Sequence, residues 1–123
     1  MTRLLFTADA SKPLLVLRIL LILFFVLMAS KNLMGNEQMR ADFARWGYPE
    51  WFRILTACLQ LLCAALFLHA SVTFYGAALL SAMMVGAALT HLRYDPPAAI
   101  VSPLIFLAFA VVLAISYRPP LLR

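Results

Sequence analysis

Long runs of apolar residues dominate this chain and restrict what it can fold into. The first covers residues 14–34, and three further runs cover about residues 51–68, 73–92 and 98–117. A helix that crosses the hydrocarbon core of a bilayer needs about 20 mostly apolar residues. Because lipid offers no partners to the backbone, its amides must be paired within helices. The sequence therefore predicts an all-α integral membrane four-helix bundle, formed by a single membrane domain over residues 1–123.

The composition excludes a soluble domain of ordinary kind. Of 123 residues, 65% are hydrophobic and 12% are charged, whereas soluble domains carry about 45–50% apolar and about 25% charged residues. A chain this short cannot bury so much apolar surface within itself. The formal net charge of +5 is better matched to lipid headgroups than to nucleic acid, so we expect membrane lipids among the partners and no nucleic acid.

A polar segment, residues 35–50, separates the first two runs. Met39, Phe43 and Trp46 recur at helical spacing on one side of this segment, which predicts a short interfacial helix between the first and second spans. Aromatic and basic residues at the ends of spans are typical anchors at the boundary between water and lipid. The expected anchors are Arg18, Trp46, Trp51 and Arg93.

Four spans would place both termini on one side of the membrane. Lys and Arg divide five to five between the two sides, counting Arg3 and Arg123, so the positive-inside rule gives little guidance. Four of the five acidic residues lie on the side opposite the termini and leave that side near neutral. They are Glu37, Asp42, Glu50 and Asp95. We therefore expect a multi-pass protein of a bacterial-type inner membrane, with cytoplasmic termini.

Small residues recur at every fourth position of the third span. Small side chains let helix backbones approach closely, and close packing drives helix association in lipid. We expect this ladder to form the tightest contact of the bundle or a contact with a partner subunit. Its members are Ala78, Ala82, Gly86 and Thr90.

Several kinds of chemistry are disfavoured by the spacing of the reactive residues. His69 and His91 end consecutive spans, so about 30 Å of membrane separates them and they cannot ligate one haem. Cys58 and Cys63 form no CxxC motif, and there is no cluster with metal-ligand spacing. No carboxylate lies within an apolar run, which disfavours a proton-coupled exporter. We expect no metal and no covalently bound cofactor.

Polar residues near the side opposite the termini form the candidate site. Lys31 ends the first span, Gln60 lies about 13 Å into the second, His91 ends the third, and Tyr48 could fold over them from the polar segment. A pocket that is apolar below and polar at its rim suits a quinone, a lipid or another amphiphilic ring. Taken singly, Lys31 and His91 are equally typical of anchors, and Gln60 of a hydrogen bond between helices.

The order of several short motifs resembles that of the DoxX-like family of four-helix membrane proteins. The matching positions run from the first span to the end of the chain, and they are Arg18, Lys31, Leu33, Phe43, Gly47-Tyr48-Pro49, Trp51, Met84-Val85-Gly86-Ala87, His91-Leu92 and Arg118-Pro119. The family usually carries a Glu in a G-x-x-E pattern in its second helix. Here that stretch reads Ala57-Cys58-Leu59-Gln60, so Gln60 replaces the acid.

The resemblance implies an association with membrane redox systems, which in this family include a thiosulfate:quinone oxidoreductase. We therefore expect a small subunit of a membrane redox or respiratory assembly that is not catalytic on its own and lines a quinone or lipid site. Other membrane or redox subunits, or a second copy of the chain, would be its partners. Two alternatives stay open, a purely structural accessory subunit without a ligand and a small-solute carrier.

Overall fold

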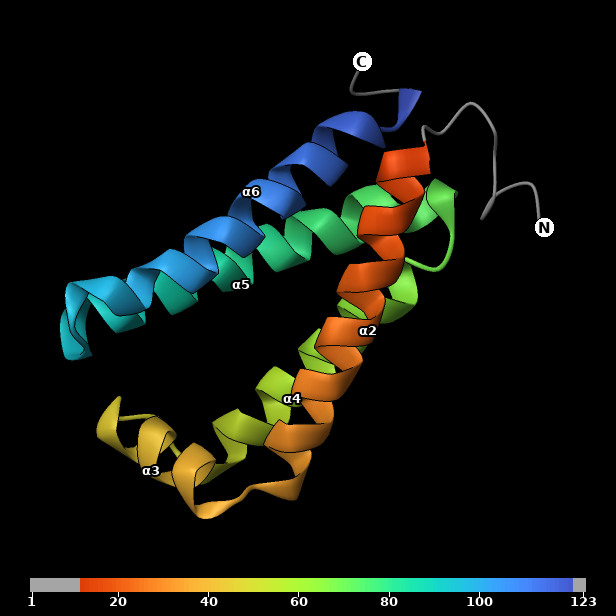
Figure 1. Ribbon diagram of the computed structural model, residues 1–123. Coiled ribbons are helices and arrows are strands. Elements are labelled where there is room, and N and C mark those ends of the chain that lie inside the picture. The colour runs from red at the N-terminus through yellow and green to blue at the C-terminus, as the bar shows by residue number, and fades with distance from the viewer. Residues whose placement is uncertain (1–11, 121–123) are drawn as a thin grey trace.

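The computed structural model describes residues 12–120, and every regular element in that part of the chain is a helix (Figure 1). Each predicted span coincides with a helical segment to within two residues at either end. The short interfacial helix is also present. In chain order the elements are α2 (Lys12–Met34), α3 (Glu37–Arg45), α4 (Glu50–Leu66), η1 (Ala70–Val72), α5 (Thr73–Tyr94), η2 (Pro97–Ile100) and α6 (Val101–Ser116).

Three helical segments of the described chain are long and apolar enough to cross a membrane. They are α2, η1 with α5, and η2 with α6. A fourth crossing arises only if α3 and α4, which are bent by 108° relative to each other, count as one broken span. By itself α4 has 17 residues, or about 25 Å of helix. These lengths and compositions fit a multi-pass membrane protein.

Arg3 and Arg123, which entered the count of Lys and Arg on the two sides of the membrane, lie outside the described residues.

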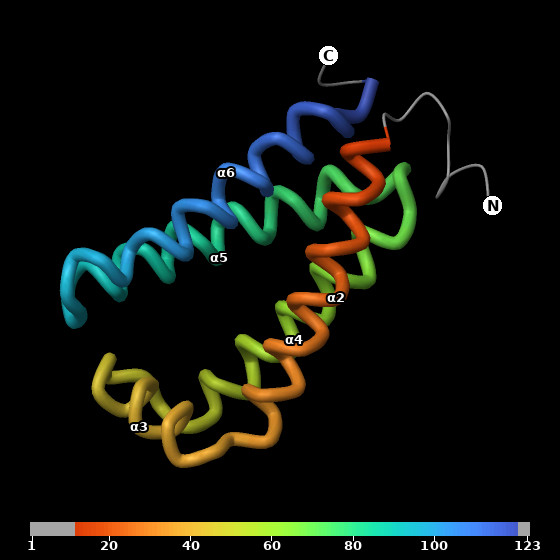
Figure 2. Tube along the Cα trace, viewed as in Figure 1, coloured from red at the N-terminus to blue at the C-terminus, as the bar shows by residue number. Residues whose placement is uncertain are grey.

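The helices are arranged as two pairs that diverge from a common end. The helix α2 packs along α4, and α5 packs along α6, while α4 also contacts α5. The pairs meet near η1, where α2 begins and α6 ends, and they separate toward α3 (Figure 2). Side chains from all four long helices fill the core near the meeting point. The core residues are Leu21, Phe25, Cys63, Phe67, Ala77, Leu80, Met84, Ala110 and Leu113.

Arg18 ties the first turns of α2 to the end of α4. We expected its side chain to extend outward to the membrane surface, but it is 1% exposed. Its Nε and Nη2 donate hydrogen bonds to the carbonyl oxygen of Phe67 at 3.0 and 2.8 Å, and its guanidinium lies 5.3 Å from the ring centre of Tyr117. The last carbonyls of a helix lack helical donors and carry the negative end of its dipole. This carbonyl therefore stabilises the buried cation.

Arg53 makes the reciprocal contact at the other end of the pair. Its side chain is 4% exposed, its Nη1 donates to the carbonyl oxygen of Asn32 near the end of α2, and its Nη2 donates to Glu50 at 2.9 Å. Gly35 gives it space, because a Cβ there would lie 2.6 Å from Nη1, and the φ of +61° also favours glycine. Along each segment the arginine lies 14 positions before the residue whose carbonyl oxygen accepts from the other arginine. The two contacts are thus about 21 Å apart along the pair.

The small-residue ladder of α5 does not form the tightest helix contact among residues 12–120. Ala78, Ala82 and Gly86 are exposed, and nothing lies within 4 Å of a Cβ built at Gly86. The close approach is made instead by Gly76, where a Cβ would lie 2.9 Å from the Cβ of Leu66 and 3.0 Å from the ring of Phe67. The helices meet at the η1 end, so the tightest contact lies near the start of α5. A contact between the ladder and a partner stays a prediction.

Two glycine substitutions in the same helix test this assignment. We expect Gly76→Ala to destabilise the protein by about 1–3 kcal/mol, the usual cost of adding a methyl group to a packed contact. The matched control Gly86→Ala should not destabilise it, because its Cβ meets open space and alanine favours a helix interior. Melting temperatures in detergent measure both effects. Equal stability of the two variants would contradict the close approach at Gly76.

Candidate functional site

A cavity of about 410 Å³ lies where the two helix pairs diverge, between α5 and the segment formed by α3 and α4. We call it the aromatic cavity, because four aromatic side chains come from the α3–α4 side. Mostly small and apolar residues of α5 form the opposite wall. The lining residues are Phe43, Trp46, Tyr48, Phe52, Thr56, Leu59, Leu79, Ala82, Met83, Gly86, Ala87, Thr90 and His91.

The aromatic rings on the α3–α4 side pack against one another. Tyr48 stacks on Phe52 with ring centres 4.5 Å apart, and Phe43 meets Trp46 edge to face at 5.2 Å. Trp46 in turn lies edge to face with His91 of α5 at 5.3 Å. Rings in offset and edge-to-face contact hold one another in place. The wall is therefore a connected aromatic surface that reaches from α3 to α5.

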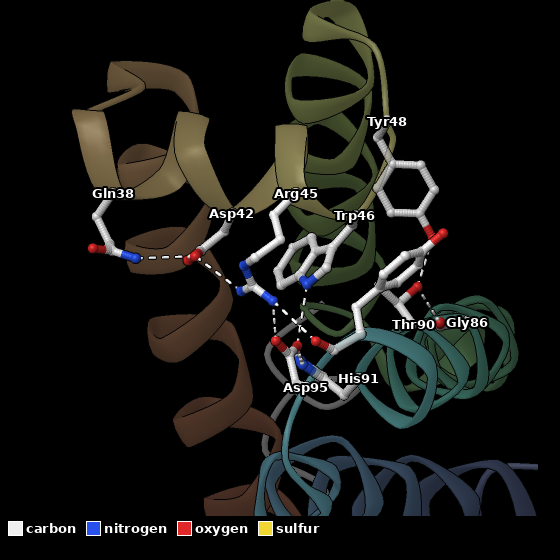
Figure 3. A network of polar contacts seen from close by, with 10 residues as sticks. Gln38, Asp42, Arg45, Trp46, Tyr48, Gly86, Thr90, His91 and Asp95 are labelled. Atoms are coloured by element: carbon white, nitrogen blue, oxygen red, sulfur yellow. Dashed lines mark hydrogen bonds and ion pairs between the residues drawn. The ribbon is translucent and has the colours of Figure 1, made fainter.

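Asp95 joins α3 to the end of α5 through a network of polar contacts (Figure 3). Its carboxylate accepts hydrogen bonds from His91 Nδ1 at 2.6 Å and Trp46 Nε1 at 3.1 Å, and it pairs with Arg45. Arg45 also pairs with Asp42 at 3.2 Å. We call Arg45, Trp46, His91 and Asp95 the Asp95 network. It connects the two helix pairs at the end where they diverge.

The contacts of this network fix the protonation of Asp95. The hydrogen bond from His91 lowers the pKa of Asp95 most, and the hydrogen bonds from Arg45 and Trp46 lower it further against the opposing effect of burial. Asp95 is therefore ionised at neutral pH and accepts a hydrogen bond from the N–H of His91 Nδ1. This leaves His91 Nε2, which has no partner among residues 12–120, as the ring nitrogen available to a ligand.

Tyr48 provides a second link to α5. Its hydroxyl lies 2.5 Å from Oγ1 of Thr90, which itself donates to the carbonyl oxygen of Gly86 at 2.9 Å. Since Thr90 uses its proton on that carbonyl, Tyr48 is the donor to Thr90. The ring of Tyr48 is thereby held against the aromatic cavity.

A second cavity of about 220 Å³ adjoins the first, and five residues line both. It extends toward α2 and α6 and contains the buried side chains of Asn32 and Gln60, with Asn32 Nδ2 donating to Gln60 Oε1 at 2.9 Å. We call it the amide cavity. The shared residues are Phe43, Trp46, Thr56, Ala87 and His91.

The structure brings together three of the four residues predicted to form the site. Tyr48 and His91 line the aromatic cavity, and Gln60 and His91 line the amide cavity. Lys31 is exposed and lines neither, because its position on α2 faces away from α4 and α5. Three ladder residues, Ala82, Gly86 and Thr90, also line the aromatic cavity.

The expected anchors divide into two groups. Trp51 is 63% exposed, and Arg93 is exposed with its guanidinium 5.4 Å from the ring centre of Tyr94. Arg18 is buried between helices instead. Trp46 contributes its ring to the cavity wall, because the turn after α3 folds back toward α5.

Two important residues were not expected in the roles that the structure gives them. Asp95 reads in the sequence as the residue before a chain break at Pro96, although its spacing of four from His91 is that of a contacting pair on a helix. Asn32 reads as part of a helix end. Its pairing with Gln60 depends on how α2 and α4 are aligned, which sequence spacing does not give.

Among residues 12–120, no group of three His, Cys, Asp or Glu side chains could hold a metal ion.

The lowered pKa of Asp95 predicts an acid-dependent loss of stability. A carboxylate with a lowered native pKa contributes its full stability above its ordinary pKa of 3.8, and loses it as the pH falls through the native pKa. We expect Asp95→Asn to lower the melting temperature at about pH 7 and to reduce its fall on acidification to about pH 3. Circular dichroism of the protein in detergent measures both.

The control for this prediction is Glu37→Gln, which removes an exposed carboxylate of α3 outside the Asp95 network. It should melt as the wild-type protein does at neutral pH and keep the wild-type acid dependence. If Asp95→Asn behaved in the same way, the network would not join the two helix pairs.

Comparison with known proteins identifies the family. No curated protein and no solved structure matches the chain. A family model, that of the DoxX-like family, matches residues 16–113 and so includes all four long helices except the first residues of α2 and the last residues of α6. This match confirms the resemblance seen in the order of the sequence motifs. The chain belongs to the DoxX-like family.

Proposed function

We propose that this chain is a small subunit of a membrane redox or respiratory assembly and that the aromatic cavity binds the ring of a quinone. One observation carries the proposal, namely a connected aromatic wall with the Nε2 of His91 available beside it. Aromatic rings stack on such a wall. With its Nδ1–H donating a hydrogen bond to Asp95, His91 can use Nε2 in two ways: as the imidazolium it donates to a ring carbonyl oxygen, and as the neutral ring it accepts from a ring hydroxyl.

The size and chemistry of the cavity suit a neutral amphiphile. Its volume of about 410 Å³ lies within the range of about 300–1,000 Å³ that is typical of small-molecule sites. The lining residues include no Asp, Glu, Lys or Arg, so the walls carry no permanent charge to pair with a charged ligand. We propose that the chain binds the ring, and that a partner subunit carries the electron transfer.

The proposal includes a four-helix bundle with α4 as the fourth crossing. Although α4 is short, it packs along α2, which has 23 residues, and Arg18 and Arg53 fix its two ends. The bend before α4 would then place α3 along the membrane surface. An even number of crossings puts both termini on one side, which we propose is the cytoplasmic side of a bacterial-type inner membrane.

A structural accessory role is the second candidate, and the exposed ladder of α5 favours it. Ala78, Ala82 and Gly86 are exposed, and nothing lies within 4 Å of a Cβ built at Gly86. Such surfaces let another helix approach closely in lipid. The occupancy of the aromatic cavity distinguishes the candidates, because the structural role requires no ligand.

Tryptophan fluorescence tests ring binding, because the chain has two tryptophans and only one lies in the cavity. In Trp51→Phe, we expect a decyl ubiquinone analogue to quench Trp46 saturably. In Trp46→Phe, the exposed Trp51 should show only the weak, linear quenching that a quinone dissolved in the micelle produces. Linear quenching of equal strength in both variants would rule out a ring site at Trp46.

A pair of histidine substitutions then tests the role of His91. In the Trp51→Phe background, His91→Ala should weaken saturable quenching about five- to tenfold, the worth of one hydrogen bond. His69→Ala, at the other end of α5, serves as the control and should leave binding unchanged. Equal effects of both substitutions would remove His91 from the site.

A further inference from the structure

The amide cavity holds an unsatisfied pair of side-chain amides. Asn32 is 3% exposed and Gln60 is 7% exposed, and they share a single hydrogen bond. Oδ1 of Asn32 is buried without a partner, and Nε2 of Gln60 has no partner among the described residues. An unpaired polar atom in such a place costs about 1–3 kcal/mol. One amide oxygen, which is buried, and one amide nitrogen of the pair are therefore unused beside the cavity.

The kinds of unused group do not depend on how the two amides are oriented. With both amides turned over, Gln60 would donate to Asn32, and the unused groups would be Nδ2 of Asn32 and Oε1 of Gln60. One amide nitrogen and one amide oxygen are left over in either arrangement. A hydroxyl group can pair with both at once. It donates its proton to the amide oxygen, and its own oxygen accepts a hydrogen bond from the amide nitrogen. A carbonyl or ether oxygen can satisfy only the donor.

The walls around the amide pair are aromatic and neutral. Phe24 and Phe106 stack with ring centres 4.5 Å apart, and Phe25 meets Phe106 edge to face at 5.5 Å. The lining residues include no Asp, Glu, Lys or Arg. The volume of about 220 Å³ exceeds the roughly 150 Å³ of an apolar cavity that holds benzene. A single aromatic ring is thus the group that these walls fit.

We propose that the Asn32–Gln60 pair binds the hydroxyl of an aromatic ring, so that the site prefers a hydroquinone or phenol to the corresponding quinone or ether. The inference rests on the proposed function, because the amide cavity shares Trp46 and His91 with the aromatic cavity. It adds the chemical form of the ligand. The preferred ligand is the reduced, hydroxyl-bearing ring.

The test compares a decyl hydroquinone with its dimethyl ether, which cannot donate a hydrogen bond and does not undergo redox cycling. Trp51→Phe protein reports binding of each through Trp46, which lines both cavities. We expect the hydroquinone to bind about five- to tenfold more tightly, the worth of one hydrogen bond. Equal affinities would overturn the inference and leave ring binding standing. No saturable binding of either compound would overturn the proposed function itself.

A double variant separates recognition by the amides from partition into the micelle. Asn32→Leu with Gln60→Met removes both amides, and removal of both partners is tolerated better than removal of one. Its preference for the hydroquinone should fall to about one. Ser30→Ala, which removes a hydroxyl from the exposed face of α2, should keep the wild-type preference. A preference that persisted in the double variant would contradict recognition by the amide pair.

A long-chain alkanol distinguishes a ring hydroxyl from a lipid hydroxyl. We expect decanol to displace the hydroquinone far more weakly than a decyl phenol does, because it offers no ring to Phe24 and Phe106. If decanol displaced the hydroquinone at the same concentration as the phenol does, the cavity would bind lipid alcohols. That result would overturn the aromatic part of the proposal.

Discussion

Two buried arginines hold α2 and α4 together at both ends. A guanidinium is expensive to place within a membrane protein unless it finds acceptors. Arg18 and Arg53 find them in the carbonyls of Phe67 and Asn32, each near the end of the partner helix. The contacts are reciprocal and tie both ends of α2 to α4. This pair is the fixed part of the structure on which the rest depends.

The second helix pair is attached to the first in a different way. Close packing at Gly76 joins α5 to α4 at one end, while the Asp95 network joins α5 to α3 at the other. Between these two connections the pairs are separated, and both cavities lie in that space. The position of the cavities therefore follows from the fold. Because α5 contacts α4 at one end and α3 at the other, a space remains between these two contacts.

The helices could be predicted from the sequence, and much of the site could not. Apolar runs define α2 and α5, and the spacing of Met39, Phe43 and Trp46 reveals α3, because these signals are local. Arg18 reads as a surface anchor since its acceptor belongs to another helix, 49 residues away. Asp95 becomes the centre of a network only once α3 bends back toward α5. Such contacts depend on packing between distant segments, which periodicity does not encode.

Photolabelling in native membranes tests the central claim, a ring site between the two helix pairs, most directly. A quinone with a diazirine on its ring would be activated by light, and the labelled peptides mapped by mass spectrometry. The account predicts adducts within residues 43–56 and 79–91, the two walls of the aromatic cavity, and their loss when excess unlabelled quinone competes. Adducts confined to the exposed faces of α2 and α6, and insensitive to competition, would contradict it.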